Sequence, residues 1–96
     1  MERLRIKIDT VHDQIFQLFI ERVQLTENIW AIKYKEEIQL NDLPREQDLI
    51  HRHDLSKELC HNVELKLAYQ EFISELIRIN KNYLNLKHEK LKNEQK

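Results

Sequence analysis

The apolar positions in the first third of the chain repeat with the period of an α-helix. When residues are placed at 100° intervals around a helix axis, six apolar side chains fall within a band roughly 80° wide. This apolar stripe consists of Leu4, Val11, Ile15, Leu18, Leu25 and Ile29. Because neither glycine nor proline interrupts the repeat, the pattern predicts one long helix from about Glu2 to near Lys35.

Two basic residues lie inside the apolar stripe. Arg22 and Lys33 are separated by about three helical turns, so their side chains leave the predicted helix on the same side. A cation on a buried face is costly in free energy unless an anion accompanies it. The sequence therefore predicts a buried place for a negatively charged group near Arg22 and Lys33.

Weaker repeats further along the chain predict two more helices. A break is expected around Glu37–Asp42, since Asn41 and Asp42 suit an N-cap and Pro44 suits a first helical turn. The second helix is expected to run from about Leu43 to Leu59. A second break is expected near His61–Asn62, with Asn62 as the cap of the next helix.

The third helix is predicted from Val63 to about Lys90. Its repeating face carries Leu65, Tyr69, Phe72, Leu76, Asn80 and Tyr83. Asn80 on this face suits a ligand contact or a hydrogen-bonding core residue equally well. We expect residues 1–90 to form a single domain and the polar residues 91–96 to form a frayed tail.

Composition supports an all-α fold and narrows the classes of function. The 96 residues include no glycine and one proline, whereas hairpin-rich β folds need turn residues at each reversal. A formal net charge of −1 gives no general attraction to nucleic acid. No apolar run approaches the ~20 residues of a membrane span, and the first residues lack a signal peptide's apolar core. We therefore expect a cytoplasmic protein that binds neither nucleic acid nor membrane.

The length of the first predicted helix indicates self-association. At 1.5 Å per residue it is about 50 Å long, which exceeds the width of a compact domain of this size. Two shorter helices of the same chain leave part of its stripe uncovered, and a two-fold homodimer is the simplest cover. A plain antiparallel helical bundle or coiled coil explains the helix pattern equally well.

A second group of charged residues surrounds the only proline. Asp42, Arg45 and Glu46 have i, i+3 and i+4 spacing, so they lie near one side of the first turn of the second predicted helix. A purely structural role is available to each: Asp42 caps the helix, Glu46 favours its positive end, and Arg45 forms a surface ion pair. Together with Arg22 and Lys33, however, these charges suit a small polyanion that also carries a hydroxyl group.

Four short motifs in the first half of the chain stand in the register of a known family. They are LRIKI at 4–8, LFIER at 18–22, IK at 32–33 and DLPRE at 42–46. Through these motifs the chain resembles the all-helical chorismate mutases, which convert chorismate to prephenate. The resemblance implies an isomerase of aromatic amino acid biosynthesis, folded as an intertwined homodimer of three-helix chains with two equivalent sites.

The resemblance also implies a role for each matching residue. Arg22 and Arg45 would grip the substrate carboxylates, and Arg5 would reach into the site of the partner subunit. Lys33 would contact a carboxylate and the ether oxygen. Asp42 and Glu46 would lie near the ring hydroxyl. A rearrangement of this kind requires fixed geometry and fixed positive charge rather than a nucleophile or base, so we expect no cofactor and no metal.

The third predicted helix departs from the family pattern. When the paired apolar residues are aligned, Asn80 takes the place of a small polar residue that binds substrate. The Gln or Glu that donates to the ether oxygen then falls on Leu84. Two alternatives to a mutase follow: an isochorismate pyruvate-lyase-like enzyme of the same fold, or a catalytically silent helical dimer with a regulatory or interaction role.

Overall fold

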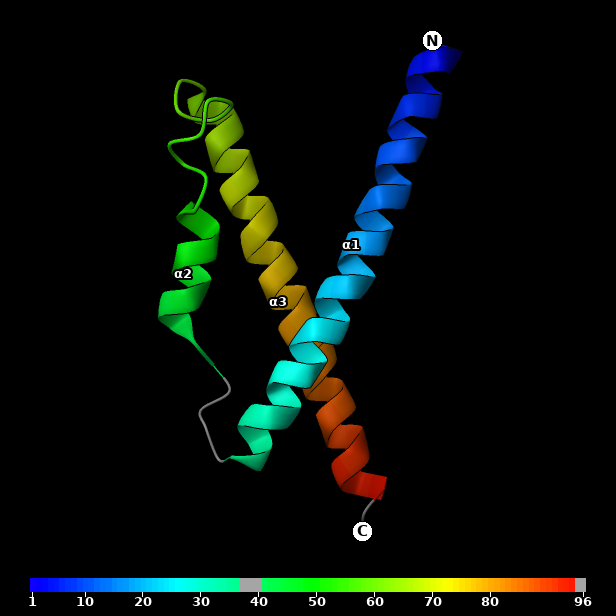
Figure 1. The fold of residues 1–96 in the computed structure, drawn as a ribbon, viewed down its shortest axis with the longest axis vertical. Helices are drawn as coiled ribbons and strands as arrows, with labels where there is room; N and C mark the ends of the chain where they lie inside the picture. Colours follow the sequence, from blue (N-terminus) through cyan, green and yellow to red (C-terminus); the bar gives the residue numbers. More distant parts are fainter. Residues whose placement is uncertain (37–40, 95–96) are drawn as a thin grey trace. The chain divides into compact units, whose positions relative to one another are not determined.

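The computed structural model describes residues 1–36 and 41–94 of the chain, with side chains as far as residue 90 (Figure 1). Three helices account for most of this part: α1 (Glu2–Lys35), α2 (Leu43–His51) and α3 (Val63–Glu94). No strand occurs within the described ranges, which confirms the all-α, three-helix prediction. The predicted break at Glu37–Asp42 falls largely on residues 37–40, which lie outside the described residues.

The chain divides into two compact units, Met1–Leu40 and Asn41–Lys96, which are described separately. The first unit contains α1, whose 34 residues confirm the predicted limits of the first helix. At 1.5 Å per residue the helix is about 51 Å long. It ends at Lys35, and the backbone N–H of the next residue, Glu36, donates to the carbonyl of Ile32. All six residues of the apolar stripe are between 45% and 63% exposed.

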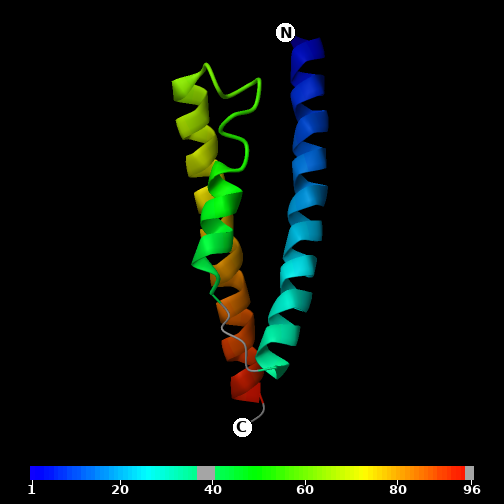
Figure 2. The same cartoon turned by 60° about the vertical axis from the view of Figure 1, so that its left-hand side comes forward.

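The second unit is a helical hairpin in which α2 runs antiparallel to α3 (Figures 1 and 2). Its first helix begins where the sequence predicts: the Asp42 carboxylate accepts a hydrogen bond from the backbone N–H of Arg45 at 3.1 Å, and Pro44 lies in the first turn. Asn62 likewise caps α3, because its side-chain oxygen accepts from the N–H of Leu65 at 3.0 Å. Local capping chemistry thus sets both helix starts.

The second helix is shorter than predicted. It ends at His51 rather than near Leu59, and turns occupy most of the segment between α2 and α3. Within this segment the N–H of Asp54 donates to the carbonyl of His51, and the N–H of Ser56 donates to that of His53. The turns bury Leu59 and bring the Asp54 carboxylate to Gln70 of α3. These contacts stabilise the reversal despite the absence of glycine or proline.

The third helix begins as predicted and continues to Glu94, four residues beyond the expected end near Lys90. Its inner row, defined here as Ile77, Asn80 and Leu84, is 2–6% exposed. The predicted face differs from this row: Asn80 is buried, whereas Leu65, Phe72 and Tyr83 are 46–54% exposed, and Leu84 is buried in place of its neighbour Tyr83. One residue corresponds to 100° of helix rotation, so a shift of one position selects a different face.

None of the three helices, within the described ranges, is long and apolar enough to cross a membrane.

Candidate functional site

The polar centre of the second unit is an ion pair between its two helices. Glu46 in the first turn of α2 contacts Lys81 of α3, with 2.6 Å between the carboxylate Oε1 and the ammonium Nζ. The Glu46 side chain is 17% exposed and that of Lys81 is 30% exposed. Partial burial reduces screening by water, so this pair is held more firmly than pairs on the open surface.

The second oxygen of the same carboxylate has a different environment. Glu46 Oε2 is buried and accepts no hydrogen bond from any described residue. A carboxylate can accept hydrogen bonds at both oxygens, and a buried acceptor without a donor costs free energy. Glu46 also lies at the positive end of α2, where a negative charge is favoured. The arrangement leaves one oxygen of a fixed carboxylate available for a further donor.

The neighbouring candidate residues make the contacts expected of purely structural residues. Asp42 caps α2, as described above. The guanidinium of Arg45 lies 3.2 Å from the carboxylate of Asp48, and both side chains are more than half exposed. Of the three predicted charges at the start of α2, the structure thus brings Glu46 towards α3 and leaves Asp42 and Arg45 on the exposed side.

Asn80 and Leu84 lie on one face of α3, one turn apart. Asn80 is 2% exposed, and it is the polar member of an inner row that is otherwise apolar. Leu84, where the resemblance places a Gln or Glu, is buried as well. Lys81 follows Asn80 directly, and it precedes Leu84 by three residues. It therefore lies on the side of Leu84, whereas Asn80, one position earlier, is rotated from it by about 100°.

The remaining candidates belong to α1. Arg22 and Lys33 are half-buried, although the apolar stripe around them is exposed. Arg5 is exposed, and its guanidinium lies 3.9 Å from the carboxylate of Glu2 one turn earlier. Long basic side chains can cover apolar surface with their stems while the charged ends stay in water.

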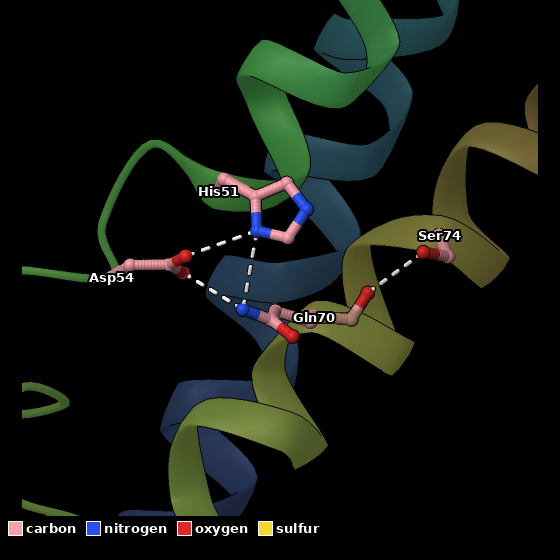
Figure 3. A network of polar contacts seen from close by, with 4 residues as sticks. All are labelled: His51, Asp54, Gln70 and Ser74. Atoms are coloured by element: carbon pink, nitrogen blue, oxygen red, sulfur yellow. Dashed lines mark hydrogen bonds and ion pairs between the residues drawn. The ribbon is translucent and has the colours of Figure 1, made fainter. Parts of the chain in front are cut away.

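A polar network at the far end of α2 was missed by the sequence reasoning (Figure 3). The Gln70 amide donates to Asp54 Oδ1 at 2.9 Å, and His51 Nδ1 lies 2.9 Å from Asp54 Oδ2. Since a carboxylate can only accept, the histidine contact requires a hydrogen on Nδ1. Hydrogen bonds from Gln70 and His51 hold the pKa of the Asp54 carboxyl below its ordinary value, against the opposing effect of burial.

His51 and His53, which flank Arg52, have separate neighbours. His51 belongs to the Asp54–Gln70 network, whereas the ring of His53 meets that of Tyr69 edge-on with centroids 6.0 Å apart. Within the described residues, no three His, Cys, Asp or Glu side chains form a group suited to a metal ion.

Lys81 is the residue of this region that sequence reasoning missed. The signal was its spacing from Ile77 and Leu84, which places it on the inner side of α3. Nothing local could show that Glu46, far earlier in the chain, is its partner.

Comparison with known protein families adds a match over most of the chain. The model of the family described as chorismate mutase type II matches residues 4–83. No curated protein and no solved structure matches the chain.

Proposed function

The chain belongs to the chorismate mutase type II family, and from this premise we propose that it catalyses the rearrangement of chorismate to prephenate. The observation that carries the proposal is the extent of the family match. Residues 4–83 include all seven candidate site residues: Arg5, Arg22, Lys33, Asp42, Arg45, Glu46 and Asn80. A match limited to the long helix would support a helical pattern and no more.

The proposed reaction depends on holding the substrate and stabilising charge. Chorismate is a flexible dianion that must adopt a chair-like geometry before its C–O bond breaks and a new C–C bond forms. Arg22 binds a carboxylate through its planar guanidinium, which lowers the entropic part of the barrier. Lys33 places a fixed positive charge at the ether oxygen, where electron density gathers in the transition state.

The start of α2 supplies the second group of contacts. Arg45 turns from Asp48 to the other substrate carboxylate, which is an inexpensive exchange because an exposed ion pair contributes only about 0–1 kcal/mol. Glu46, with Asp42 nearby, accepts from the ring hydroxyl. Asn80 contributes a polar group from the inner row of α3.

The active form in this proposal is an intertwined homodimer. The exposed apolar stripe of α1 supports it, since an exposed patch of this length is unusual on a chain that works alone. A second copy would cover the stripe, and Arg5 would enter the site of that second copy. The location that fits the proposal is the cytoplasm, where such biosynthetic enzymes work.

Two further candidate functions remain beside the mutase, and Leu84 bears on both. A buried leucine at the place of the ether-oxygen donor weakens the case for fast mutase chemistry. A catalytically silent helical dimer would tolerate this change, and a lyase acting on isochorismate would use a similar cationic pocket for a related reaction.

One assay distinguishes these functions. The purified chain is incubated with chorismate and, separately, with isochorismate, while substrate absorbance, prephenate and pyruvate are followed. Saturable conversion of chorismate to prephenate is the expected result. Release of pyruvate from isochorismate alone would identify the lyase, and turnover of neither substrate would identify the silent dimer.

A further inference from the structure

The ion pair between Glu46 and Lys81 differs from the other ion pairs described above. Arg5–Glu2, Arg45–Asp48 and His51–Asp54 each join residues three positions apart along the chain. Lys81 instead reaches from α3 to the first turn of α2, and both partners are more than two-thirds buried. The contact therefore fixes a side chain of one helix with respect to the other.

The contact uses one carboxylate oxygen and leaves the other one without a donor. Lys81 Nζ lies 2.6 Å from Glu46 Oε1, while Oε2 is buried and unsatisfied with respect to the described residues. An ammonium group on Oε1 restricts rotation of the carboxylate, so the direction of Oε2 is fixed as well. A fixed acceptor that has already lost its water is suited to a hydroxyl donor.

We propose that Lys81 is a positioning residue that holds Glu46 by one oxygen, so that the other oxygen selects ligands bearing a ring hydroxyl. The inference rests on the proposed function, because the ligand is the cyclic dicarboxylate of that site. The inference adds Lys81 to the proposed site as a residue that contacts the Glu46 carboxylate and does not contact the substrate. A ligand that reaches Oε2 displaces the side chains that cover it, so the hydroxyl is recognised as the site rearranges locally.

The substitution that tests the proposal is Lys81→Met, which keeps an unbranched stem and removes the charge. The matched control is Lys90→Met, which removes an exposed lysine of the same helix beyond the family match. Two probes are compared by competition with chorismate: a cyclic dicarboxylic acid with a ring hydroxyl, and the same acid without it. Circular dichroism establishes whether each variant is folded. If Lys81→Met does not fold, Lys81→Gln is used in its place.

The wild type and Lys90→Met should prefer the hydroxylated probe by about tenfold or more, the value of one charge-assisted hydrogen bond. Lys81→Met should reduce that preference to about threefold or less while the affinity for the deoxy probe changes little. Lys81→Arg should restore much of the preference. Glu46→Gln should lose it, and adding Lys81→Met to Glu46→Gln should cause no further loss.

Three results would overturn the proposal, and they are distinguishable. If the wild type is active and Lys81→Met keeps the full preference, Lys81 does not position Glu46. If affinity for both probes falls equally, the ion pair is purely structural. If the wild type neither converts chorismate nor binds either probe, the proposed function fails and the role of Lys81 fails with it.

Discussion

The apolar stripe of α1 and the inner row of α3 follow the same helical period, but they differ sharply in exposure. Leu18 in the stripe is 63% exposed, whereas Ile77 and Leu84 in the inner row are 6% and 5% exposed. Both helices were predicted from spacing, but the inner row of α3 was not the face that the spacing selected. The difference shows that periodicity identifies a helix with an apolar face, while a second surface decides whether that face is buried.

Charged residues sharpen the comparison. In α1, Arg22 and Lys33 lie within an apolar stripe that the described structure leaves open. In the second unit, Lys81 lies beside a buried row and already has a carboxylate partner. Basic residues thus lie in two settings: half-buried on an apolar face whose apolar members are exposed, and paired with a carboxylate beside a buried row.

The largest expected effect is that of Arg22→Ala. Loss of a bidentate contact to a substrate carboxylate should lower kcat/KM by roughly 3 kcal/mol, or about a hundredfold or more. The free energy of unfolding should change much less than the activation free energy, because the Arg22 side chain is only half-buried. Steady-state kinetics and thermal denaturation measure the two quantities, and Arg3→Ala, an exposed arginine of the same helix, is the control. A large loss of stability with unchanged kinetics would make Arg22 a structural residue.

The next effect concerns the buried row of α3. Leu84→Gln should restore a donor to the ether oxygen and raise kcat by up to about a hundredfold, the value of one such donor elsewhere. KM should change less, since the contact strengthens in the transition state. Leu84→Met, which keeps the site apolar, is the control. Destabilisation without any gain in kcat would show that Leu84 does not occupy the position of the family's Gln.

The apolar stripe itself is tested by Leu18→Asp. Placing a charge at the centre of a dimer interface should cost about 2 kcal/mol or more of association free energy. Light scattering should give about twice the 11.8 kDa chain mass for the wild type and a lower mass for the variant. Gln24→Asp introduces the same charge off the stripe and should leave the dimer intact. A wild type that is monomeric and fully folded at micromolar concentration would contradict the proposed dimer.

The smallest expected effect is a pH dependence at the far end of α2. The pKa of Asp54 is lowered in the folded chain, so this carboxylate stabilises the fold above about pH 4, the ordinary range of an aspartate. The contribution is lost as the pH falls through the lowered value. Asp54→Asn should therefore differ from the wild type most at neutral pH and least in strong acid, in denaturation midpoints measured from pH 7 to 2. Gln70→Ala should show the same trend, and a constant difference would contradict it.

Those parts of the fold that depend on neighbouring residues were predicted correctly. The limits of α1 followed from an uninterrupted repeat, and Asp42 and Asn62 cap their helices as their side chains suggest. The end of α2 was not predictable in this way. It depends on Gln70, whose amide bonds Asp54 from 16 residues further along the chain, and no glycine or proline marks the reversal.

In the candidate site too, positions along one helix were predicted and contacts between helices were not. Glu46 was predicted to carry chemistry from its spacing to Asp42 and Arg45 and from the family resemblance, yet its partner Lys81 was not identified. Asn80 was placed on the third helix by its spacing, and its burial follows the inner row rather than the predicted face ending at Tyr83. Spacing along one helix fixes which residues are neighbours on it, whereas contacts between helices depend on their relative rotation.

The antiparallel pairing of α2 and α3 also has a consequence for the order of folding. Asp54 and Gln70 close a short loop near the turn, whereas Glu46 and Lys81 close a longer one at the open end. Each doubling of loop length costs about 0.6 kcal/mol of chain entropy, so we expect the hairpin to zip from the turn towards Glu46. The N-terminal residues of α2 would then separate from α3 before the segment that joins the two helices opens. The backbone amides of these residues would exchange fastest with deuterium. The end of the hairpin that bears the proposed site is thus the end that opens most readily to admit a ligand.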